Sequence, residues 1–219
     1  MKININRTLL LKLYKFLYNV TLFSIHLMIF LKLVEAQISE RFVFLEFFPL
    51  YQVATYAQIL DVFHGIIGIT NTGMSESSIQ IFGRIFMLYV IEGNPMIHNQ
   101  LETIILLYAW VLIELFRYPY YALRSWNSEI YLLTWLRYSA WIPLYPIGLF
   151  IEWLSMVSSL KFYYRSSKYS LQIPYLQFSL NFGIVLSVLS FLVMPFISRK
   201  LIVHMSKQRK KKLYSGKNK

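Results

Sequence analysis

The feature that most constrains this chain is a series of apolar segments, each about as long as a membrane crossing. A helix needs about 20 mainly apolar residues to span the hydrocarbon core. We place such spans at residues 13–34, 47–69, 79–97, 100–122, 129–157 and 175–198. Short polar stretches separate them, including TNTG at 70–73 and EGNP at 92–95. The sequence therefore predicts an all-α, polytopic membrane bundle of six transmembrane helices.

The composition agrees with a protein that has little mass outside a bilayer. Of the 219 residues 57% are hydrophobic and 15% are charged, whereas soluble domains carry about a quarter charged residues. Cysteine is absent, which excludes disulfides and thiolate chemistry. The four histidines lack zinc-site spacing, and no glycine-rich nucleotide-binding motif occurs. We therefore expect neither a metal nor another cofactor.

The distribution of basic residues predicts the orientation. An even number of spans puts both termini on one side, and the positive-inside rule makes that side cytosolic. With cytosolic termini, 17 Lys and Arg residues face the cytosol and 5 face the other side. We divide the chain into a cytosolic N-terminal segment (1–12), a six-helix membrane domain (13–198) and a basic cytosolic tail (199–219). The tail follows an apolar run directly, so it indicates membrane-flanking charge rather than nucleic-acid binding. The first span is expected to be retained rather than cleaved as a signal.

Tyr145 and Glu152 are the leading candidates for chemistry. They lie seven residues apart in an apolar run, so they share one helix face with about 10 Å between them along the axis. A carboxyl group at membrane depth is costly unless it has a partner or a function. A phenol and a carboxyl group can act as a general acid/base pair. The alternative is an interfacial aromatic ring and a structural hydrogen-bonding group.

Other polar residues recur at helical spacing in spans two to four. Three pairs share a helix face: Asp61 with His64, Gln80 with Arg84, and Glu114 with Arg117. Their similar depth predicts a polar cavity inside the bundle, although Glu114 and Arg117 also fit a self-contained ion pair. Arg84, Arg117 and Arg137 are predicted near the cytosolic ends of their spans. They are candidates to bind an anionic ligand, with membrane-anchoring arginines as the alternative.

The fifth predicted span should be kinked. It contains Pro143, Pro146 and Gly148, and each proline removes a backbone donor from the helix. The carbonyls freed at about residues 139–142 need other partners, which indicates protein neighbours or a cavity. Tyr145 and Glu152 are thus expected at and beyond a bend.

Five motifs give the chain a specific family resemblance. They are WLRYSAWIPLYPIGLFIE at 135–152, LDVFHGIIG at 60–68, QIFGR at 80–84, WVLIELFRYPYY at 110–121 and HMSKQRKKKL at 204–213. Together, and in this order, they resemble the very-long-chain 3-hydroxyacyl-CoA dehydratases, also called the protein tyrosine phosphatase-like A family. Tyr145 and Glu152 match the two residues regarded as catalytic in that family. Asp61 stands where the family usually has Glu, and Gly83 and Val111 stand where it usually has Ser.

The resemblance implies dehydration of a 3-hydroxyacyl-CoA to a trans-2-enoyl-CoA. This is the third step of fatty-acid elongation in the endoplasmic reticulum membrane, with elongases and reductases as expected partners. Glu152 is our first choice as base and Tyr145 as proton donor, and the reverse assignment stays open. Tyr138 joins Asp61, His64 and Gln80 as a candidate for the substrate or the polar cavity. The CoA head is expected at Arg84, Arg117 or Arg137, with the basic tail at 207–212 as the alternative. The rival functions are a non-catalytic scaffold for elongation enzymes and, more remotely, a small transporter.

Overall fold

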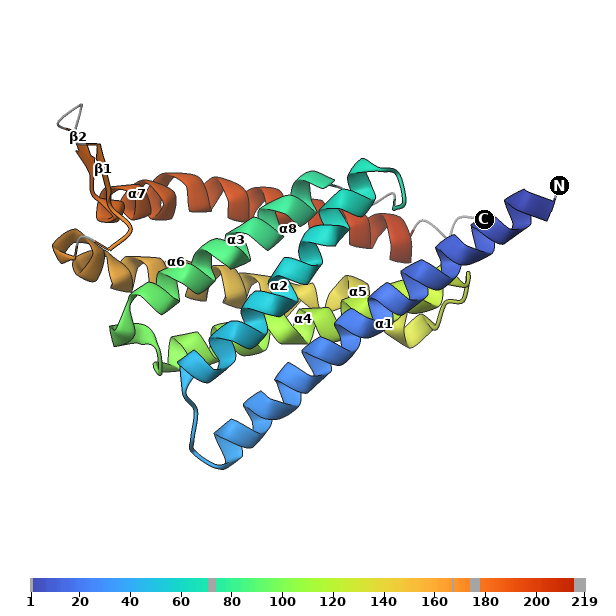
Figure 1. Cartoon of the computed structure of the whole chain (residues 1–219), viewed down its shortest axis with the longest axis horizontal. Helices are drawn as coiled ribbons and strands as arrows, with labels where there is room; N and C mark the ends of the chain where they lie inside the picture. The colour runs from blue at the N-terminus through green and yellow to red at the C-terminus, as the bar shows by residue number, and fades with distance from the viewer. Residues whose placement is uncertain (1, 71–73, 167, 174–177, 215–219) are drawn as a thin grey trace.

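A computed structural model describes residues 2–70, 74–166, 168–173 and 178–214 of the chain (Figure 1). Helices dominate it, and two short strands form a hairpin. The elements are α1 (Lys2–Ile38), α2 (Phe44–Ile66), α3 (Met74–Gly93), η1 (Pro95–Ile97), α4 (Leu101–Ser125), α5 (Tyr131–Ser139), α6 (Trp141–Arg165), β1 (Leu171–Ile173), β2 (Phe178–Leu180), α7 (Phe182–Val188), a π-helical turn η3 (Leu189–Val193) and α8 (Met194–Leu213). The all-α class predicted from the sequence is confirmed.

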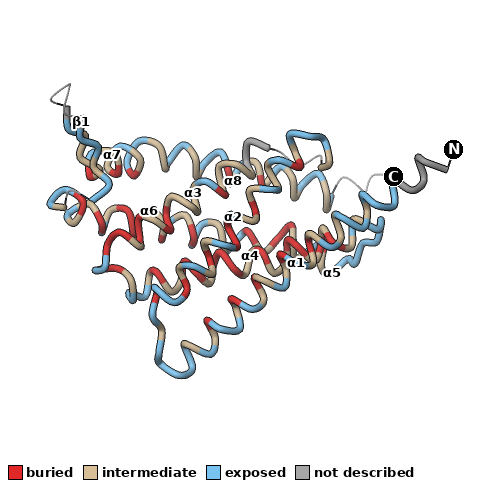
Figure 2. Tube along the Cα trace, in the orientation of Figure 1, coloured by how far each residue is buried: buried red, intermediate tan, exposed pale blue. Residues whose placement is uncertain are grey.

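The helices run back and forth along the long axis of the molecule, so α1 begins and α8 ends on the same side (Figure 1). Helix α4 is central, because it packs against α1, α5 and α6. Its residues Leu106, Leu107 and Val111 are completely buried. Figure 2 shows buried positions along α4 and on parts of α6. These two helices carry the residues of the candidate site.

The predicted fifth span is divided into two helices. Helix α5 ends at Ser139 and α6 begins at Trp141, with Ala140 between them. Pro143 has no N–H to donate to the carbonyl of Ser139, so the regular ladder is interrupted here. The indole N–H of Trp141 donates to the carbonyl oxygen of Tyr138 at 2.9 Å, which gives a carbonyl near the break a partner. Helix α6 continues to Arg165, beyond the predicted end at residue 157.

The predicted start of the sixth span, at residue 175, is wrong. Residues 178–180 form strand β2, which pairs antiparallel with β1, and the helix begins only at Phe182. Residues 174–177 lie outside the described residues. The helical path continues through η3 into α8 and ends at Leu213, inside the segment predicted as a tail. Pro195 lies at the start of α8 and has no N–H for the preceding turn, which accounts for the π-helical turn before it.

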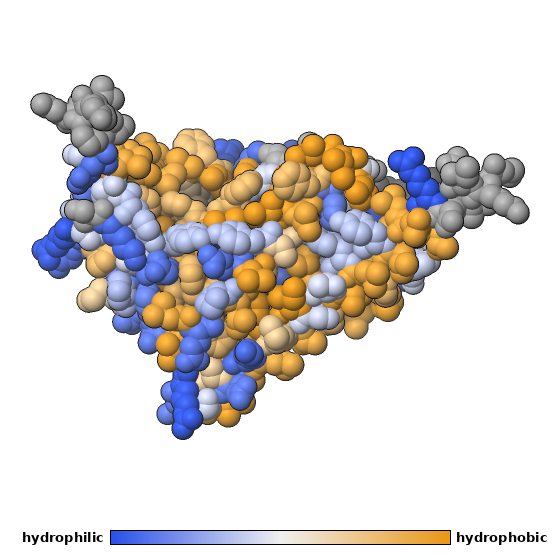
Figure 3. Space-filling model, viewed as in Figure 1, coloured by the Kyte–Doolittle hydropathy of each residue, from blue (hydrophilic) through white to orange (hydrophobic). Residues whose placement is uncertain are grey.

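Three stretches of the described chain are long and apolar enough to cross a membrane: Arg7–Ile38, Tyr131–Arg165 and Phe182–Leu213. Apolar side chains cover much of the middle of the face shown in Figure 3, and hydrophilic ones gather toward its corners. The protein is therefore a membrane protein. Helices α2, α3 and α4, also predicted as spans, are not among the three stretches. They carry buried polar and charged residues, and each such residue lowers the mean hydropathy of a helix.

Candidate active site

A cavity of about 390 Å³ lies between α3, α4, α6 and the η3–α8 segment. Tyr145 and Glu152 both line it, as the sequence predicts for two residues on one face of a helix. Gln80 and Arg84 of α3 and Trp110 of α4 supply the other polar groups of the lining. The remaining lining is mainly apolar. The cavity thus combines a small set of polar groups with space for a hydrocarbon chain.

Helix α6 presents one continuous face to this cavity. The lining positions of α6 are Leu144, Tyr145, Gly148, Leu149, Glu152 and Met156. They follow the helical spacing of three and four residues. Gly148 lies between the phenol and the carboxyl group, and a Cβ there would be in ordinary contact with Ala109 Cβ at 3.8 Å. Gly148 therefore adds no side chain to the lining between Tyr145 and Glu152.

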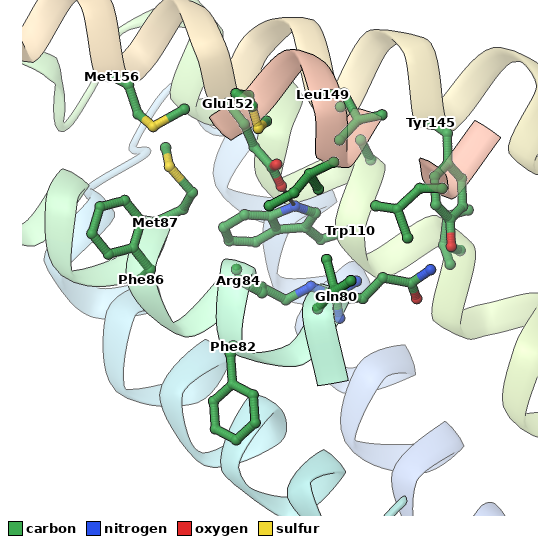
Figure 4. A pocket seen from close by; sticks show the side chains of 18 of the residues that line it. Gln80, Phe82, Arg84, Phe86, Met87, Trp110, Tyr145, Leu149, Glu152 and Met156 are labelled. Carbon is green, nitrogen blue, oxygen red and sulfur yellow. Dashed lines mark hydrogen bonds between the residues drawn. The ribbon is translucent and has the colours of Figure 1, made fainter. Parts of the chain in front are cut away.

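Trp110 holds one oxygen of Glu152. Its indole N–H donates to Glu152 Oε1 at 2.9 Å, and its side chain is buried (Figure 4). Glu152 Oε2 takes no part in this bond. Sequence reasoning placed Trp110 in a family motif but did not propose it as a site residue. The sequence feature that could have identified Trp110 is its spacing of four residues from Glu114, which places both on the inward face of α4.

Tyr145 lies at the other end of the cavity. Figure 4 shows its ring projecting from α6 on the same side of the cavity as the amide of Gln80, away from Met156. The ring of Trp141 packs edge-on against it, with 6.3 Å between the ring centroids. In the described part of the chain, the Tyr145 hydroxyl has no hydrogen-bond partner. A phenol next to an open cavity is therefore available to a ligand.

Next to the cavity lies an ion network of four charged side chains. Arg84 contacts Glu114 Oε1 at 2.8 Å, Arg117 contacts Glu114 Oε2 at 2.8 Å, and Arg117 contacts Asp61 Oδ2 at 2.9 Å. Gln58 accepts a further hydrogen bond from Arg84 at 3.0 Å. Glu114 is fully buried, so its charge depends on the two arginines. The interpretation of Glu114 and Arg117 as a self-contained pair is wrong, because both residues have further charged partners.

Arg84 is the point of contact between the network and the cavity. It lines the cavity, and its guanidinium lies 5.5 Å from the centre of the Trp110 ring. Trp110 in turn binds Glu152. The network therefore reaches the candidate carboxyl group through one cation–π contact and one hydrogen bond.

Asp61 and His64 separate although they share a helix face. Asp61 accepts hydrogen bonds from Arg117 and from Tyr18 of α1. His64 is hydrogen-bonded to the hydroxyl of Tyr14, also on α1, at 2.7 Å. Neither residue is part of the described cavity lining. The shorter side chain of Asp61, where the family usually has Glu, still reaches Arg117.

Arg137 and Tyr138 lie on α5 and are not part of the cavity lining. The guanidinium of Arg137 lies 5.6 Å from the centres of both the Tyr121 and the Tyr138 rings, and it donates to the Tyr121 hydroxyl at 3.3 Å. Tyr138 is 3.5 Å from the hydroxyl of Tyr120. The structure thus places Tyr145, Glu152, Gln80 and Arg84 together at the cavity. Arg117, Asp61, His64, Arg137 and Tyr138 lie around it with partners of their own.

Fold and site define a helical membrane protein with an acid/base-capable cavity. The sequence model of the family described as "Protein tyrosine phosphatase-like protein, PTPLA" matches residues 55–215, and the chain belongs to this family. The matched range contains every residue of the cavity lining named above.

Curated relatives give the same grouping. The chain is 33% identical over 164 residues to the mouse (Mus musculus) protein named very-long-chain (3R)-3-hydroxyacyl-CoA dehydratase 3, covering 74% of this chain and 45% of the relative. It is 35% identical over 166 residues to a dehydratase of chicken (Gallus gallus), with 74% and 45% covered. Against human (Homo sapiens) dehydratase 2 it is 27% identical over 203 residues, covering 90% and 80%. The chain thus spans about 45% of the length of the mouse and chicken relatives. No solved structure matches it.

Proposed function

We propose that this protein removes water from a 3-hydroxyacyl-CoA to form a trans-2-enoyl-CoA. The observation that carries the proposal is the cavity that both Tyr145 and Glu152 line, with Gly148 between them on the same helix face. Family membership and the names of the relatives supply the substrate class. The apolar remainder of the lining fits the acyl chain.

The reaction needs one base and one acid. Glu152 takes the proton from C2, which the neighbouring thioester makes more acidic, and the electron pair of that C–H bond forms the C2–C3 double bond. Tyr145 donates its hydroxyl proton to the C3 oxygen, which leaves as water, because hydroxide is a poor leaving group. A proton returned from the Glu152 carboxyl group to the phenolate through water restores both groups.

The contact with Trp110 supports this assignment of roles. One carboxylate oxygen of Glu152 accepts the indole N–H, which fixes the group and leaves the second oxygen for the proton of the substrate. Tyr145 keeps a free hydroxyl at the opposite end of the cavity. A carboxylate held by one donor and a phenol with a free hydroxyl are consistent with Glu152 as the base and Tyr145 as the proton donor.

The biological setting proposed here is the elongation of very-long-chain fatty acids. The protein would act as a six-span enzyme in the endoplasmic reticulum membrane, with both termini in the cytosol and with elongases and reductases as partners. Helix α1 begins and helix α8 ends on the same side of the molecule, which supports an even number of crossings (Figure 1).

The topology can be tested with glycosylation tags. A tag at either end should stay unmodified, and a tag near Glu40 should be modified. The opposite pattern would reverse the topology.

The deciding experiment is an assay of the purified full chain in nanodiscs. Incubation with a long-chain (3R)-3-hydroxyacyl-CoA should give the trans-2-enoyl-CoA, and the enoyl product should be hydrated in the reverse direction. Chromatography with mass detection follows both thioesters. Absence of turnover in both directions, in protein that is folded by circular dichroism, would reject the proposed function.

A further inference from the structure

The ion network leaves little free positive charge for the phosphates of a CoA thioester. Arg84 and Arg117 are already paired with Glu114, and Arg117 also with Asp61. Arg137 is enclosed by two tyrosine rings. The head of coenzyme A carries several negative charges, which bind best to cations without a carboxylate partner. Arg137 has no carboxylate partner within the described residues either, but its guanidinium packs against these two rings, so solvent-exposed cations of this kind lie elsewhere on the protein.

A second hollow lies where the start of α6 meets the end of α8. Its lining consists of Trp141, Ile142, Ser206, Arg209, Lys210 and Tyr214. The composition differs from that of the first cavity, because two cations and two aromatic side chains occur beside one serine and one aliphatic side chain. Guanidinium and ammonium groups bind phosphate, and exposed aromatic rings stack on nucleobases.

Arg209 is oriented but not neutralised. Its Nε lies 3.3 Å from Ser139 Oγ, one of its terminal nitrogens donates to the Tyr214 hydroxyl at 3.2 Å, and its guanidinium lies 5.5 Å from the Tyr214 ring centre. These partners are uncharged. Within the described residues, neither Arg209 nor Lys210 forms a salt bridge with a carboxylate. Lys212 on the same helix is different, since it pairs with Glu129 at 2.7 Å.

Trp141 connects this hollow to the candidate active site. The indole lines the hollow, and it also packs edge-on against Tyr145, which lines the first cavity. Trp141 and Tyr145 are one helical turn apart on α6, or about 6 Å along the axis. The indole N–H of Trp141 donates to the Tyr138 carbonyl oxygen, so this ring is held in place between the two spaces. The hollow and Tyr145 are therefore separated by about one helical turn of α6.

We propose that the α6–α8 hollow binds the nucleotide end of the acyl-CoA, with Arg209 and Lys210 contacting its phosphates and Tyr214 contacting the adenine ring. The proposal rests on the function proposed above, and it places the head group at α8 rather than at the buried arginines. Tyr214 is 51% exposed, which leaves aromatic surface for a base. The acyl chain then extends past Trp141 into the apolar cavity.

The test compares two substrates with the same acyl chain, one ending in coenzyme A and one in pantetheine. Arg209→Gln and Lys210→Gln should each raise KM for the CoA thioester by about tenfold, because ground-state binding is lost. KM for the pantetheine thioester should change by less than about twofold. Lys211→Gln is the matched control, since Lys211 is an exposed lysine of the same helix outside the hollow. It should match the wild type on both substrates.

A binding measurement separates this proposal from the proposed function. Free coenzyme A should bind the wild-type protein in phosphatidylcholine nanodiscs and should bind Arg209→Gln about tenfold more weakly. If the wild type has no dehydratase activity but this difference persists, the function fails and the site stands. Equal KM changes on both substrates, or unchanged coenzyme A binding in both variants, would overturn the site. An effect seen only with phosphatidylserine in the nanodiscs would assign the cations to lipid headgroups and would also overturn it.

Discussion

Two polar regions lie side by side inside this bundle. They differ in whether their polar groups have partners within the protein. In the ion network, Asp61, Arg84, Glu114 and Arg117 bind one another at 2.8–2.9 Å. At the cavity, within the described residues, the Tyr145 hydroxyl has no hydrogen-bond partner and Glu152 accepts from one donor, Trp110. Polar groups that are fully paired within the protein hold helices together. Polar groups that lack such partners and face an open space are available for a ligand.

The comparison teaches that polarity at membrane depth does not by itself identify a functional residue. Arg117 and Glu152 are both costly to place in an apolar bundle. Arg117 is surrounded by acidic and phenolic partners, so its cost is offset within the protein. Glu152 faces a cavity lined mainly by apolar groups. The difference lies in the neighbours, and the predictions below change one region while leaving the other intact.

The largest expected effect is on catalysis. Tyr145→Phe and Glu152→Gln should each lower kcat by at least about 100-fold, because each removes a proton-transfer group and little volume. Thermal unfolding in detergent should shift little, since neither group belongs to the ion network. Turnover of a 3-hydroxyacyl-CoA and the unfolding midpoint are measured on the same preparations. Near wild-type turnover in either variant would remove that residue from the mechanism.

The second effect is on stability. Glu114→Gln leaves Arg84 and Arg117 buried without their shared counter-charge, and we expect a loss of about 3–5 kcal/mol in unfolding free energy. The matched control is Glu129→Gln, which breaks the exposed pair with Lys212 and should cost no more than about 1 kcal/mol. Denaturant unfolding of both variants measures the difference. Equal losses would mean that the buried network contributes no more than a surface pair.

The third effect tests the connection between the two regions. Trp110→Phe removes the N–H that binds Glu152 and keeps an aromatic ring beside Arg84. We expect kcat to fall about 10- to 100-fold, because a hydrogen bond to a charged group contributes about 1.5–3 kcal/mol. In a Glu152→Gln background the same change should add almost nothing, because the two residues act as a unit. KM should move less than kcat if Trp110 positions Glu152. Additive losses would instead indicate a packing role for Trp110.

The smallest effect concerns Asp61. The side chain of Asp61 is 23% exposed, and Arg117 retains its ion pair with Glu114 when Asp61 is neutralised. Asp61→Asn should therefore cost about 1 kcal/mol in stability and should leave kcat nearly unchanged, because the residue lies outside the cavity lining. Asp61→Glu, which restores the residue usual in the family, should be close to neutral in the same unfolding measurement. A large drop in turnover for Asp61→Asn would connect the network directly to the chemistry.

Sequence reasoning located most of the helices and predicted that Tyr145 and Glu152 share one helix face, which the cavity lining confirms. Apolar length and polar breaks placed the helices, and spacing by seven residues put Tyr145 and Glu152 on one face. The errors arose where a chain segment takes its form from neighbours. Residues 178–180 are apolar enough to extend a span, yet they pair with residues 171–173 as a hairpin. Similarly, the pattern Glu114–Arg117 within one helix gave no information about Arg84 or Asp61 on other helices.

The sequence by itself therefore determined an all-α membrane protein, its family, and a phenol and a carboxyl group on one helix face. These follow from hydropathy, residue order and helical periodicity, which are local properties. Only the tertiary structure decided which polar residues neutralise one another and which face a cavity. Asp61, Arg84 and Glu114 come from three different helices, and their pairing depends on how α2, α3 and α4 pack. For the same reason Trp110 was found as the partner of Glu152 only once α4 and α6 were seen side by side.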